Sequence, residues 1–227
     1  MPNPVESHQI QAIIEVCHRL YDRGMVTATD GNVSIRLNDG NILATRSGIN
    51  KGNVTASDLT EVSPSGTSPG TAKPSTEIGL HLFIYTQRPD VMAVVHAHPT
   101  VATAFSVAHI PLDQPILPEV IVGLGAIPLA QYATPSTPEV AASLRPFVNI
   151  CEAVLLANHG VVTYGTDVWD AYFKMEKVEH AAHITFLARM LGGEQALTPQ
   201  QLERLQAVSG QSYGKDIGRR LRDLGIM

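Results

Sequence analysis

Two long segments of the chain carry apolar side chains at helical spacing. Residues 7–23 place isoleucine, cysteine, leucine and tyrosine side chains three or four positions apart and end at Gly24. Residues 167–191 repeat this spacing and end at Gly192-Gly193. Residues three and four apart share one face of a helix, and glycine commonly follows a helix C-terminus. We therefore predict a long amphipathic helix in each segment.

Shorter helices are indicated by residues that favour a helix N-terminus. Ser75, Thr76 and Glu77 suit the cap and the first turn of a helix, because their oxygens accept hydrogen bonds and a negative charge complements the helix dipole. On this signal we predict a helix over residues 75–87. Two further helices are predicted to begin at Pro99-Thr100 and at Thr198-Pro199.

The strand signals lie between these helices. Residues 33–37 alternate apolar and polar side chains, reach a turn at Asn38-Asp39-Gly40-Asn41, and are followed by a second short apolar stretch at 42–45. This arrangement predicts a β-hairpin. Continuous apolar runs predict further, buried strands at residues 91–95, 153–157 and 161–164.

Several strands with tight turns, mixed with long helices, are typical of a layered α/β domain. The Ser-, Gly- and Pro-rich stretch 63–74 predicts a surface loop, and composition does not change across it. We therefore expect one domain over residues 1–227. The basic, glycine-broken stretch 212–227 is expected to form a C-terminal arm of this domain.

Composition excludes several classes of partner. The formal net charge of −5 gives no reason to expect nucleic acid or an anionic membrane as a partner. No apolar run approaches the ~18–20 residues that span a bilayer, and the N-terminus lacks the features of a secretion signal. Cys17 and Cys151 lie far apart in apolar stretches, as buried reduced thiols do. We expect a soluble, cytoplasmic protein.

Candidate chemistry is concentrated in three histidines. His96 and His98 end the apolar run 91–95, and side chains two residues apart in a strand point to the same face. His159 ends another apolar run, and Gly160 after it permits close approach of the backbone. Imidazoles that share a target suit a divalent metal, most of all zinc. The three residues are therefore our candidate metal ligands.

Two other groups of side chains have competing interpretations. Glu77 is a candidate fourth ligand, although its position also suits a glutamate that complements a helix dipole. Glu176, His180 and His183 share a face of the predicted helix 167–191. Such a set more often forms a solvated or packing face, so we leave it out of the site.

Six short motifs occur together along the chain and give it a specific resemblance. They are Thr29-Asp30-Gly31-Asn32-Val33-Ser34, Thr45-Arg46-Ser47-Gly48, Lys73-Pro74-Ser75-Thr76-Glu77, His96-Ala97-His98-Pro99, Gln131-Tyr132-Ala133-Thr134-Pro135-Ser136-Thr137 and Asn158-His159-Gly160. In this order they resemble the class II aldolase/adducin family, which includes the fuculose-1-phosphate aldolases. The resemblance implies a three-layer α/β/α fold with a central, mainly antiparallel sheet, and a homotetramer with sites at subunit interfaces.

The same resemblance implies roles for individual residues. His96, His98 and His159 would bind Zn²⁺, for which Mn²⁺ or Co²⁺ could substitute, while Glu77 would ligate the resting metal and then act as a base. A helix N-terminus with small hydroxyls and backbone N–H groups can bind an anion without net positive charge. The residues that would bind the substrate phosphate are Gly31, Asn32, Ser47, Gly48, Ser75 and Thr76.

The implied activity is retro-aldol cleavage of a phosphorylated ketose to dihydroxyacetone phosphate and an aldehyde. A 4-epimerase of a sugar phosphate and a decarboxylase of a phosphorylated keto acid would use the same scaffold. An adducin-like binding module without catalysis is a further alternative, but it would not need Glu77 together with the three histidines. A zinc hydrolase is disfavoured because the chain lacks a His-Glu-x-x-His helix.

Some positions depart from the family pattern. In the fuculose-phosphate aldolases, a tyrosine of a neighbouring subunit acts as an acid, and it lies in the stretch that aligns with 111–122. This chain has no tyrosine there. Glu119 is a candidate replacement acid or an exposed structural glutamate. Tyr213 resembles a C-terminal tyrosine of the family that closes over the site. Alternatively, it only anchors the tail. Asp30 and Arg46 also differ from the commoner residues, and Arg46 could contact a substrate carboxylate or phosphate. These departures leave the substrate open.

Overall fold

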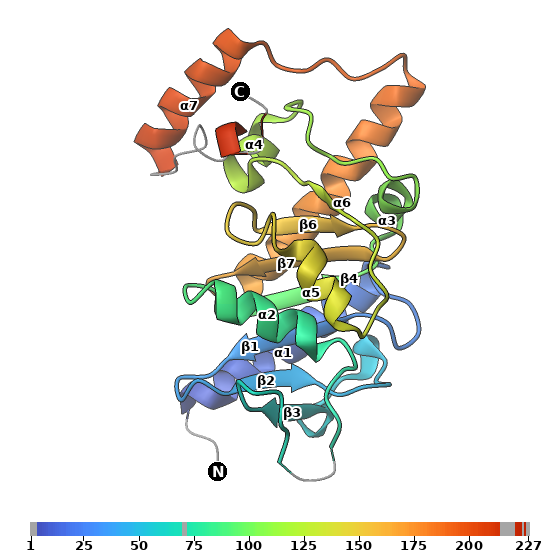
Figure 1. The fold of residues 1–227 in the computed structure, drawn as a ribbon, viewed down its shortest axis with the longest axis vertical. Helices are drawn as coiled ribbons and strands as arrows, with labels where there is room; N and C mark the ends of the chain where they lie inside the picture. The colour runs from blue at the N-terminus through green and yellow to red at the C-terminus, as the bar shows by residue number, and fades with distance from the viewer. Residues whose placement is uncertain (1–3, 70–71, 214–220, 224, 226–227) are drawn as a thin grey trace.

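A seven-stranded sheet forms the centre of the computed structural model (Figure 1). The structure describes residues 4–69, 72–213, 221–223 and 225, with only the backbone of 4–6 and 211–213. The strands follow the order β3-β2-β1-β4-β7-β6-β5, and every neighbouring pair is antiparallel except β5 and β6. Their bounds are β1 Asn32–Arg36, β2 Ile42–Thr45, β3 Leu59–Val62, β4 Ala93–Ala97, β5 Leu129–Ala130, β6 Ala153–Leu156 and β7 Gly160–Gly165.

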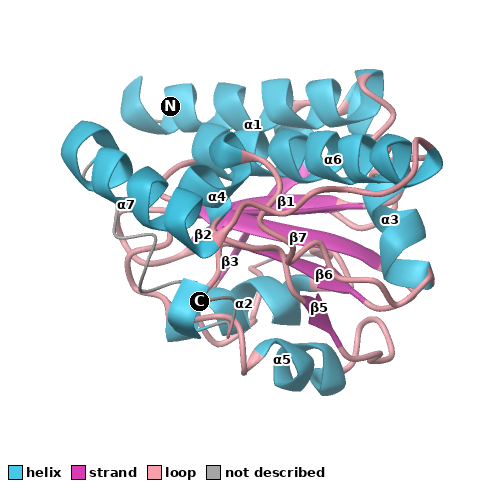
Figure 2. Cartoon of the chain, turned by 90° about the horizontal axis from the view of Figure 1, so that it is seen from above, coloured by secondary structure: helices cyan, strands magenta, loops and turns pink. Residues whose placement is uncertain are grey.

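Helices cover both faces of this sheet. Figure 2 shows α1, α3 and α6 on one face and α2 and α5 on the other. The predicted three-layer α/β/α fold with a mainly antiparallel sheet is therefore confirmed. The helices are α1 Pro4–Asp22, α2 Ile78–Gln87, α3 Thr100–Val107, α4 Pro118–Leu124, α5 Pro138–Leu144, α6 Val168–Met190 and α7 Pro199–Tyr213, with short 3₁₀ turns η1 Lys51–Asn53 and η2 Ala56–Asp58.

The central strand β4 is buried on both faces. Val95 packs into the core under α1 and α6, whereas Val94 packs into the core under α2 and α5. Because side chains alternate along a strand, His96 lies on the same face of the sheet as Val94. The continuous apolar run in the sequence thus reflects burial on both faces, and it places the histidine on the α2 side.

Strand pairing fixes which residues surround that histidine. His96 of β4 lies opposite Asn32 of β1 on one side and opposite Val162 of β7 on the other. A slip of β4 by one residue would turn the His96 side chain to the opposite face of the sheet, away from α2. The sheet therefore determines the neighbours of the histidine.

Most of the predicted elements are present. The β1–β2 hairpin forms as predicted, the long helices appear as α1 and α6, and Cys17 and Cys151 are buried and form no disulfide bond. The prediction that a helix begins at Ser75 was wrong, because α2 begins at Ile78. Glu77 occupies the N-cap position, but its side chain makes no cap hydrogen bond and lies beside histidines instead. Strands β3 and β5 and helices α4 and α5 were not predicted.

The C-terminal part of the chain packs against α4. Residues 214–220 of the predicted C-terminal arm lie outside the described residues. Leu221 is fully buried in a small cluster with Ile121 of α4 and Leu202 of α7. The described part of the arm is thus packed onto the domain. Among the described residues, no helix is both long and apolar enough to cross a membrane.

Candidate functional site

The three predicted histidines converge at one end of the central strands of the sheet. His96 lies in β4, His98 follows the end of that strand, and His159 lies in the turn between β6 and β7. One ligand atom from each residue can be chosen so that all three lie within 4.8 Å of one another. The Nε2 atoms of His96 and His98 are 3.1 Å apart. The three histidines could therefore hold a metal ion.

Backbone groups orient these imidazole rings. Nδ1 of His96 lies 2.9 Å from the carbonyl oxygen of Val161, so it donates a proton there and leaves the lone pair of Nε2 facing the cluster. Gly160 makes room for the next ring, because a Cβ atom at that position would lie 2.5 Å from Cδ2 of His98. Asn158 adopts a left-handed φ of 56°, which closes the turn that carries His159.

Glu77 lies against the histidine cluster. Its Oε2 atom is 3.3 Å from Nε2 of His96, and its Oε1 atom is 3.2 Å from Nε2 of His159. Nδ2 of Asn32 donates a hydrogen bond of 3.0 Å to Oε2. The Oε1 atom is buried and accepts no hydrogen bond from any described residue. A buried carboxylate oxygen without a donor is costly unless a cation compensates it.

These donors fit a divalent metal. Imidazole nitrogens and a carboxylate oxygen are ligands that zinc and related ions accept. With the His98 proton on Nδ1, which lies 3.8 Å from Oδ2 of Asp30, the Nε2 lone pairs of His96 and His98 would face each other and favour a cation between them. The arrangement therefore suits a bound cation better than a set of ordinary side-chain hydrogen bonds.

The protonation states of the site also suit metal binding. Burial lowers the pKa of His96 to about 3 and lowers the pKa of His98 as well. Burial alone would raise the pKa of Glu77, but the neighbouring His96 and His159 outweigh it and hold that pKa below its usual range. At neutral pH the cluster thus contains neutral His96 and His98 imidazoles and an ionised carboxylate, which are the forms that ligate metals.

A polar cavity of about 250 Å³ opens beside the cluster. Loops from the ends of β1 and β2 and the residues before α2 form its walls. The structure brings all six predicted phosphate-binding residues into this lining, together with Glu77 and His98. The full lining is Thr29, Asp30, Gly31, Asn32, Arg46, Ser47, Gly48, Lys51, Ser75, Thr76, Glu77 and His98, which we call the cradle.

Gly31 allows the cradle to approach β4. It has a φ of +72°, and a Cβ atom there would lie 2.6 Å from Cγ1 of Val26 and 2.9 Å from the carbonyl oxygen of His96. Any other residue would clash with this strand and adopt an unfavourable backbone conformation. The glycine thus lets the cradle loop lie directly against the strand that carries the histidines.

Two residues near the site escaped the sequence analysis. Lys51 is 1% exposed, lines the cradle, and donates from Nζ to the carbonyl oxygens of Thr29 and Ile49 at 3.1 and 2.7 Å. Its sequence context, a polar turn, gives no signal for burial. His81 is buried below Asn32, and its Nε2 atom hydrogen-bonds Oδ1 of that residue. Its position four residues after Glu77 on a helix could have revealed it.

The other residues that the sequence singled out differ in where the structure places them. Glu119 is exposed in the first turn of α4 and lines a separate cavity of about 520 Å³, which shares no residue with the cradle. Within one chain, Glu119 therefore does not lie in the same cavity as the cluster of His96, His98 and His159. Tyr213 ends α7, but its side chain lies outside the described residues. Asp30 and Arg46 both line the cradle, with Oδ2 of Asp30 at 3.8 Å from Nδ1 of His98.

The histidines of α6 show no comparable convergence. Glu176 pairs with Arg23 at 2.9 Å and accepts a hydrogen bond from Tyr172. The only metal-ligand group found among the described residues is the triad around His96. Leaving the α6 set out of the site agrees with this geometry.

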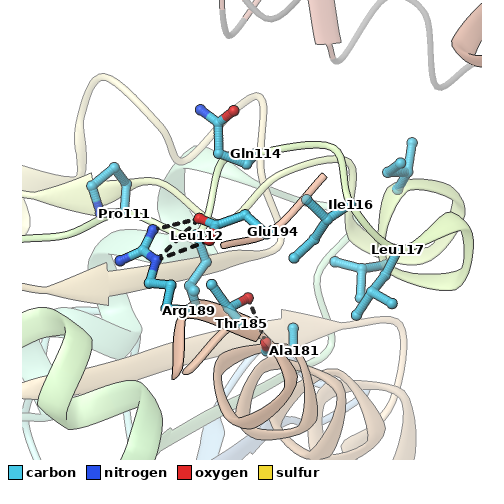
Figure 3. Close-up of a pocket in the computed structure, with 11 residues that line it drawn as sticks. Pro111, Leu112, Gln114, Ile116, Leu117, Ala181, Thr185, Arg189 and Glu194 are labelled. Atoms are coloured by element: carbon cyan, nitrogen blue, oxygen red, sulfur yellow. Dashed lines mark hydrogen bonds and ion pairs between the residues drawn. The ribbon is translucent and has the colours of Figure 1, made fainter. Parts of the chain in front are cut away.

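A third, much smaller pocket lies between the 111–121 segment and the C-terminal half of α6 (Figure 3). Its lining is largely apolar and is crossed by an ion pair in which Nη2 of Arg189 lies 2.8 Å from Oε1 of Glu194. The cavity measures about 20 Å³, which is room for about one water molecule. This pocket is too small for a metabolite and shares no residue with the cradle.

Comparison with known proteins identifies the family. The sequence matches the Class II Aldolase and Adducin N-terminal domain over residues 11–186, which is most of the chain. The chain belongs to the class II aldolase and adducin family. The histidine cluster and the cradle are formed by residues within this matched region.

Relatives within the family carry out more than one reaction. The chain is 35% identical to the 3-oxo-tetronate 4-phosphate decarboxylase of Escherichia coli K12, over 81% of this chain and 88% of that protein. It is 34% identical to the L-fuculose phosphate aldolase of a Methanococcus maripaludis strain, over 78% of this chain and 96% of that protein. The structure of YgbL from Escherichia coli superposes with a TM-score of 0.81 at 32% identity, covering 88% and 99% of the two chains. Family membership therefore leaves both a decarboxylase and an aldolase as close relatives.

Proposed function

We propose that this protein is a divalent-metal carbon–carbon lyase that decarboxylates a small phosphorylated 3-oxo acid. The observation that carries the proposal is the composition of the cradle, where two cationic side chains, Arg46 and Lys51, lie beside the histidine cluster. The Nε atom of Arg46 is buried without a hydrogen-bond partner among the described residues. A phosphorylated keto acid brings two anionic groups, whereas a phosphorylated ketose brings one.

In this proposal the cradle binds the phosphate through the hydroxyls of Ser47, Ser75 and Thr76 and the backbone at Gly48. Arg46 provides the planar donor group that suits a carboxylate or phosphate. His96, His98, His159 and Glu77 would hold the metal, which we propose is zinc, with manganese or cobalt able to substitute. When bound, such an ion acts as a Lewis acid and stabilises negative charge that develops on substrate oxygens.

In a decarboxylation, the protein's own residues need only provide a proton after the carbon–carbon bond has broken. When the carboxylate leaves as carbon dioxide, the electron pair of the broken carbon–carbon bond stays on the substrate as an enediolate, and one carbon must take up a proton. Glu77 lies against the histidine cluster, with its Oε1 atom 3.2 Å from Nε2 of His159. Its carboxylate is ionised, so it would first take up a proton from solvent water and then transfer that proton to the carbon. No base is needed to remove a hydroxyl proton.

Retro-aldol cleavage of a phosphorylated ketose is the second candidate. It is favoured by the relatives named as L-fuculose phosphate aldolases, and it would leave the same kind of enediolate. It differs in one requirement, since a base must take the proton of the hydroxyl that becomes the aldehyde. The chain has no tyrosine in 111–122, and Glu119 of the same chain lies in a separate cavity. We therefore place the aldolase second, ahead of an epimerase and of a non-catalytic adducin-like module.

A substrate panel tests this proposal. The purified protein, reconstituted separately with zinc, manganese and cobalt, is offered 3-oxo-tetronate 4-phosphate and a set of phosphorylated ketoses. We expect carbon dioxide release from the keto acid, with weaker or absent aldehyde release from the ketoses. Aldehyde release with no carbon dioxide would favour the aldolase instead. Epimerised product without cleavage, or no turnover with any metal, would contradict the lyase proposal.

We also propose that the protein assembles as a homotetramer in which Glu119 of one subunit faces the histidines of another. Light scattering coupled to size-exclusion chromatography measures the assembly. Mixed assemblies of His96→Ala and Glu119→Gln subunits would regain activity if the two residues act across an interface, since some sites would then contain both native groups. A monomeric active enzyme would contradict this arrangement.

A further inference from the structure

A line of buried polar side chains runs from Glu77 into the layer between the sheet and α2. Asn32 contacts Glu77, His81 contacts Asn32, Ser34 contacts His81, and Tyr85 contacts Ser34. All four residues beyond Glu77 are buried, with exposures of 0–4%. Asn32 and Ser34 lie on one face of β1, and His81 and Tyr85 lie one turn apart on α2. The two elements thus form a polar seam within an otherwise apolar core.

The direction of these hydrogen bonds follows from the carboxylate at one end. Ionised Glu77 can only accept, so the neighbouring amide of Asn32 presents its Nδ2 group to it, at 3.0 Å. The oxygen of that amide then faces His81 and accepts from Nε2, which must carry the ring proton. Nδ1 of His81 is therefore the acceptor for the Ser34 hydroxyl, at 2.7 Å. Burial lowers the pKa of His81 to about 4, which is consistent with a neutral ring.

We propose that His81 is a positioning residue, which fixes the amide of Asn32 so that its N–H group stays on the Glu77 carboxylate. The inference rests on the proposed role of Glu77 as a metal ligand. An amide turned by half a rotation would place its oxygen against the carboxylate, and repulsion would move Glu77 away from the histidines. Groups that hold a ligand in place commonly change metal affinity or activity by about 10–100-fold when removed.

This arrangement orients a group and does not conduct protons. An amide cannot pass a proton from His81 to Glu77 without forming an unfavourable tautomer. The amide of Asn32 therefore interrupts any proton transfer along the seam. Tyr85, at the far end of the seam, hydrogen-bonds Ser34 and lies three hydrogen bonds away from Asn32 along this seam. Its hydroxyl supplies a matched control, because its removal disturbs the same buried seam without touching the amide.

The test compares His81→Phe, His81→Gln and Tyr85→Phe. We expect His81→Phe to weaken zinc affinity, measured by competition with a chelator, by about 10-fold or more. His81→Gln retains a donor and is expected to recover most of that loss, and Tyr85→Phe to stay within about 2-fold of the native protein. If His81 only filled space, the two phenylalanine variants would share a lower thermal stability while zinc affinity stayed native, and the proposal would be overturned.

A second measurement does not require any variant to fold. Histidine nitrogen shifts in NMR spectra of the native protein report which ring nitrogen carries the proton, and we expect protonated Nε2 and bare Nδ1 for His81. The opposite tautomer would overturn the proposal. Neither measurement uses a substrate, so failure of the substrate panel would contradict the proposed reaction and leave this inference separately testable.

Discussion

At the scale of single residues, His96 is the most deeply buried of the proposed metal ligands. It is fully buried, and its Nδ1 atom is held by the backbone of β7. We expect His96→Ala to lose bound metal and activity together, because the remaining two histidines cannot replace a missing donor. Elemental analysis of the purified variant and an activity assay measure both. His183→Ala, an exposed histidine on α6, is the matched control. Stoichiometric metal in the His96 variant would contradict the site.

Lys51 gives a second prediction at this scale. Lys51→Met keeps most of the stem but removes the ammonium group from the cradle. A hydrogen bond to a charged group contributes about 1.5–3 kcal/mol, so we expect KM for the phosphorylated substrate to rise about 10-fold or more, with a smaller change in kcat. Steady-state kinetics separate the two constants. Arg204→Met, on an exposed position of α7, should leave both unchanged. An unchanged KM in the Lys51 variant would remove it from substrate binding.

The residues that the sequence predicted and those that it missed differ in a physical way. The three histidines and the six predicted phosphate-binding residues lie at the ends of strands or just before α2, where local patterns place them at the same ends of neighbouring strands. Lys51 and His81 become part of the site only through tertiary packing. A lysine in a polar turn is normally solvated, and the sequence contains no sign that the carbonyl groups of Thr29 and Ile49 surround this one.

At the scale of elements, the turn before β1 determines how closely the cradle approaches β4. Gly31→Ala would combine an unfavourable φ with contacts below 3 Å to Val26 and to the backbone of His96. We expect the free energy of unfolding to fall by about 2–4 kcal/mol, measured by urea denaturation. Gly24→Ala is the matched control, since its φ of +66° is similar but a Cβ there meets nothing within 4 Å. Equal losses in the two variants would show that backbone conformation alone explains the cost.

Helices and strands could be predicted from the sequence where the pattern of apolar residues extends over many positions. The 19-residue α1 and the 23-residue α6 repeat their apolar spacing over several turns, so the helical period is evident. Strand β5 has two residues and β3 has four, too few for alternation to stand out from chance. The start of α2 was misplaced because Ser75, Thr76 and Glu77 resemble a cap in sequence. In the fold their side chains belong to the cradle.

At the scale of the whole molecule, buried neutral histidines make stability depend on pH. Burial lowers the pKa of His81 to about 4 and that of His96 to about 3, whereas unfolded histidine titrates near about 6.5. Between these values the unfolded chain binds protons that the folded chain excludes. The free energy of unfolding therefore falls as pH decreases from about 6.5 to about 4, with His81 alone contributing about 3 kcal/mol.

Urea denaturation of the metal-free protein at several pH values measures this loss. The control is His81→Gln, which removes one titrating group. The free energy of unfolding of this variant should change less with pH, by the amount that the binding of one proton contributes. Glu77 adds to the same trend below its unfolded pKa, because its folded pKa is depressed and its charge is lost at still lower pH. Stability that did not change over this range would contradict neutral, buried histidines.

The strand pairing around His96 also bears on when a metal could bind during folding. The proposed ligands come from positions 77, 96, 98 and 159, and they meet only after β4 has paired with its neighbours and the β6–β7 turn has closed. Such long sequence separations are closed late, so a transition state would lack most of the site. We expect added zinc to leave the refolding rate nearly unchanged and to slow unfolding, as stopped-flow traces can show. The metal would then stabilise the completed fold by slowing its unfolding, and it would take no part in the folding nucleus.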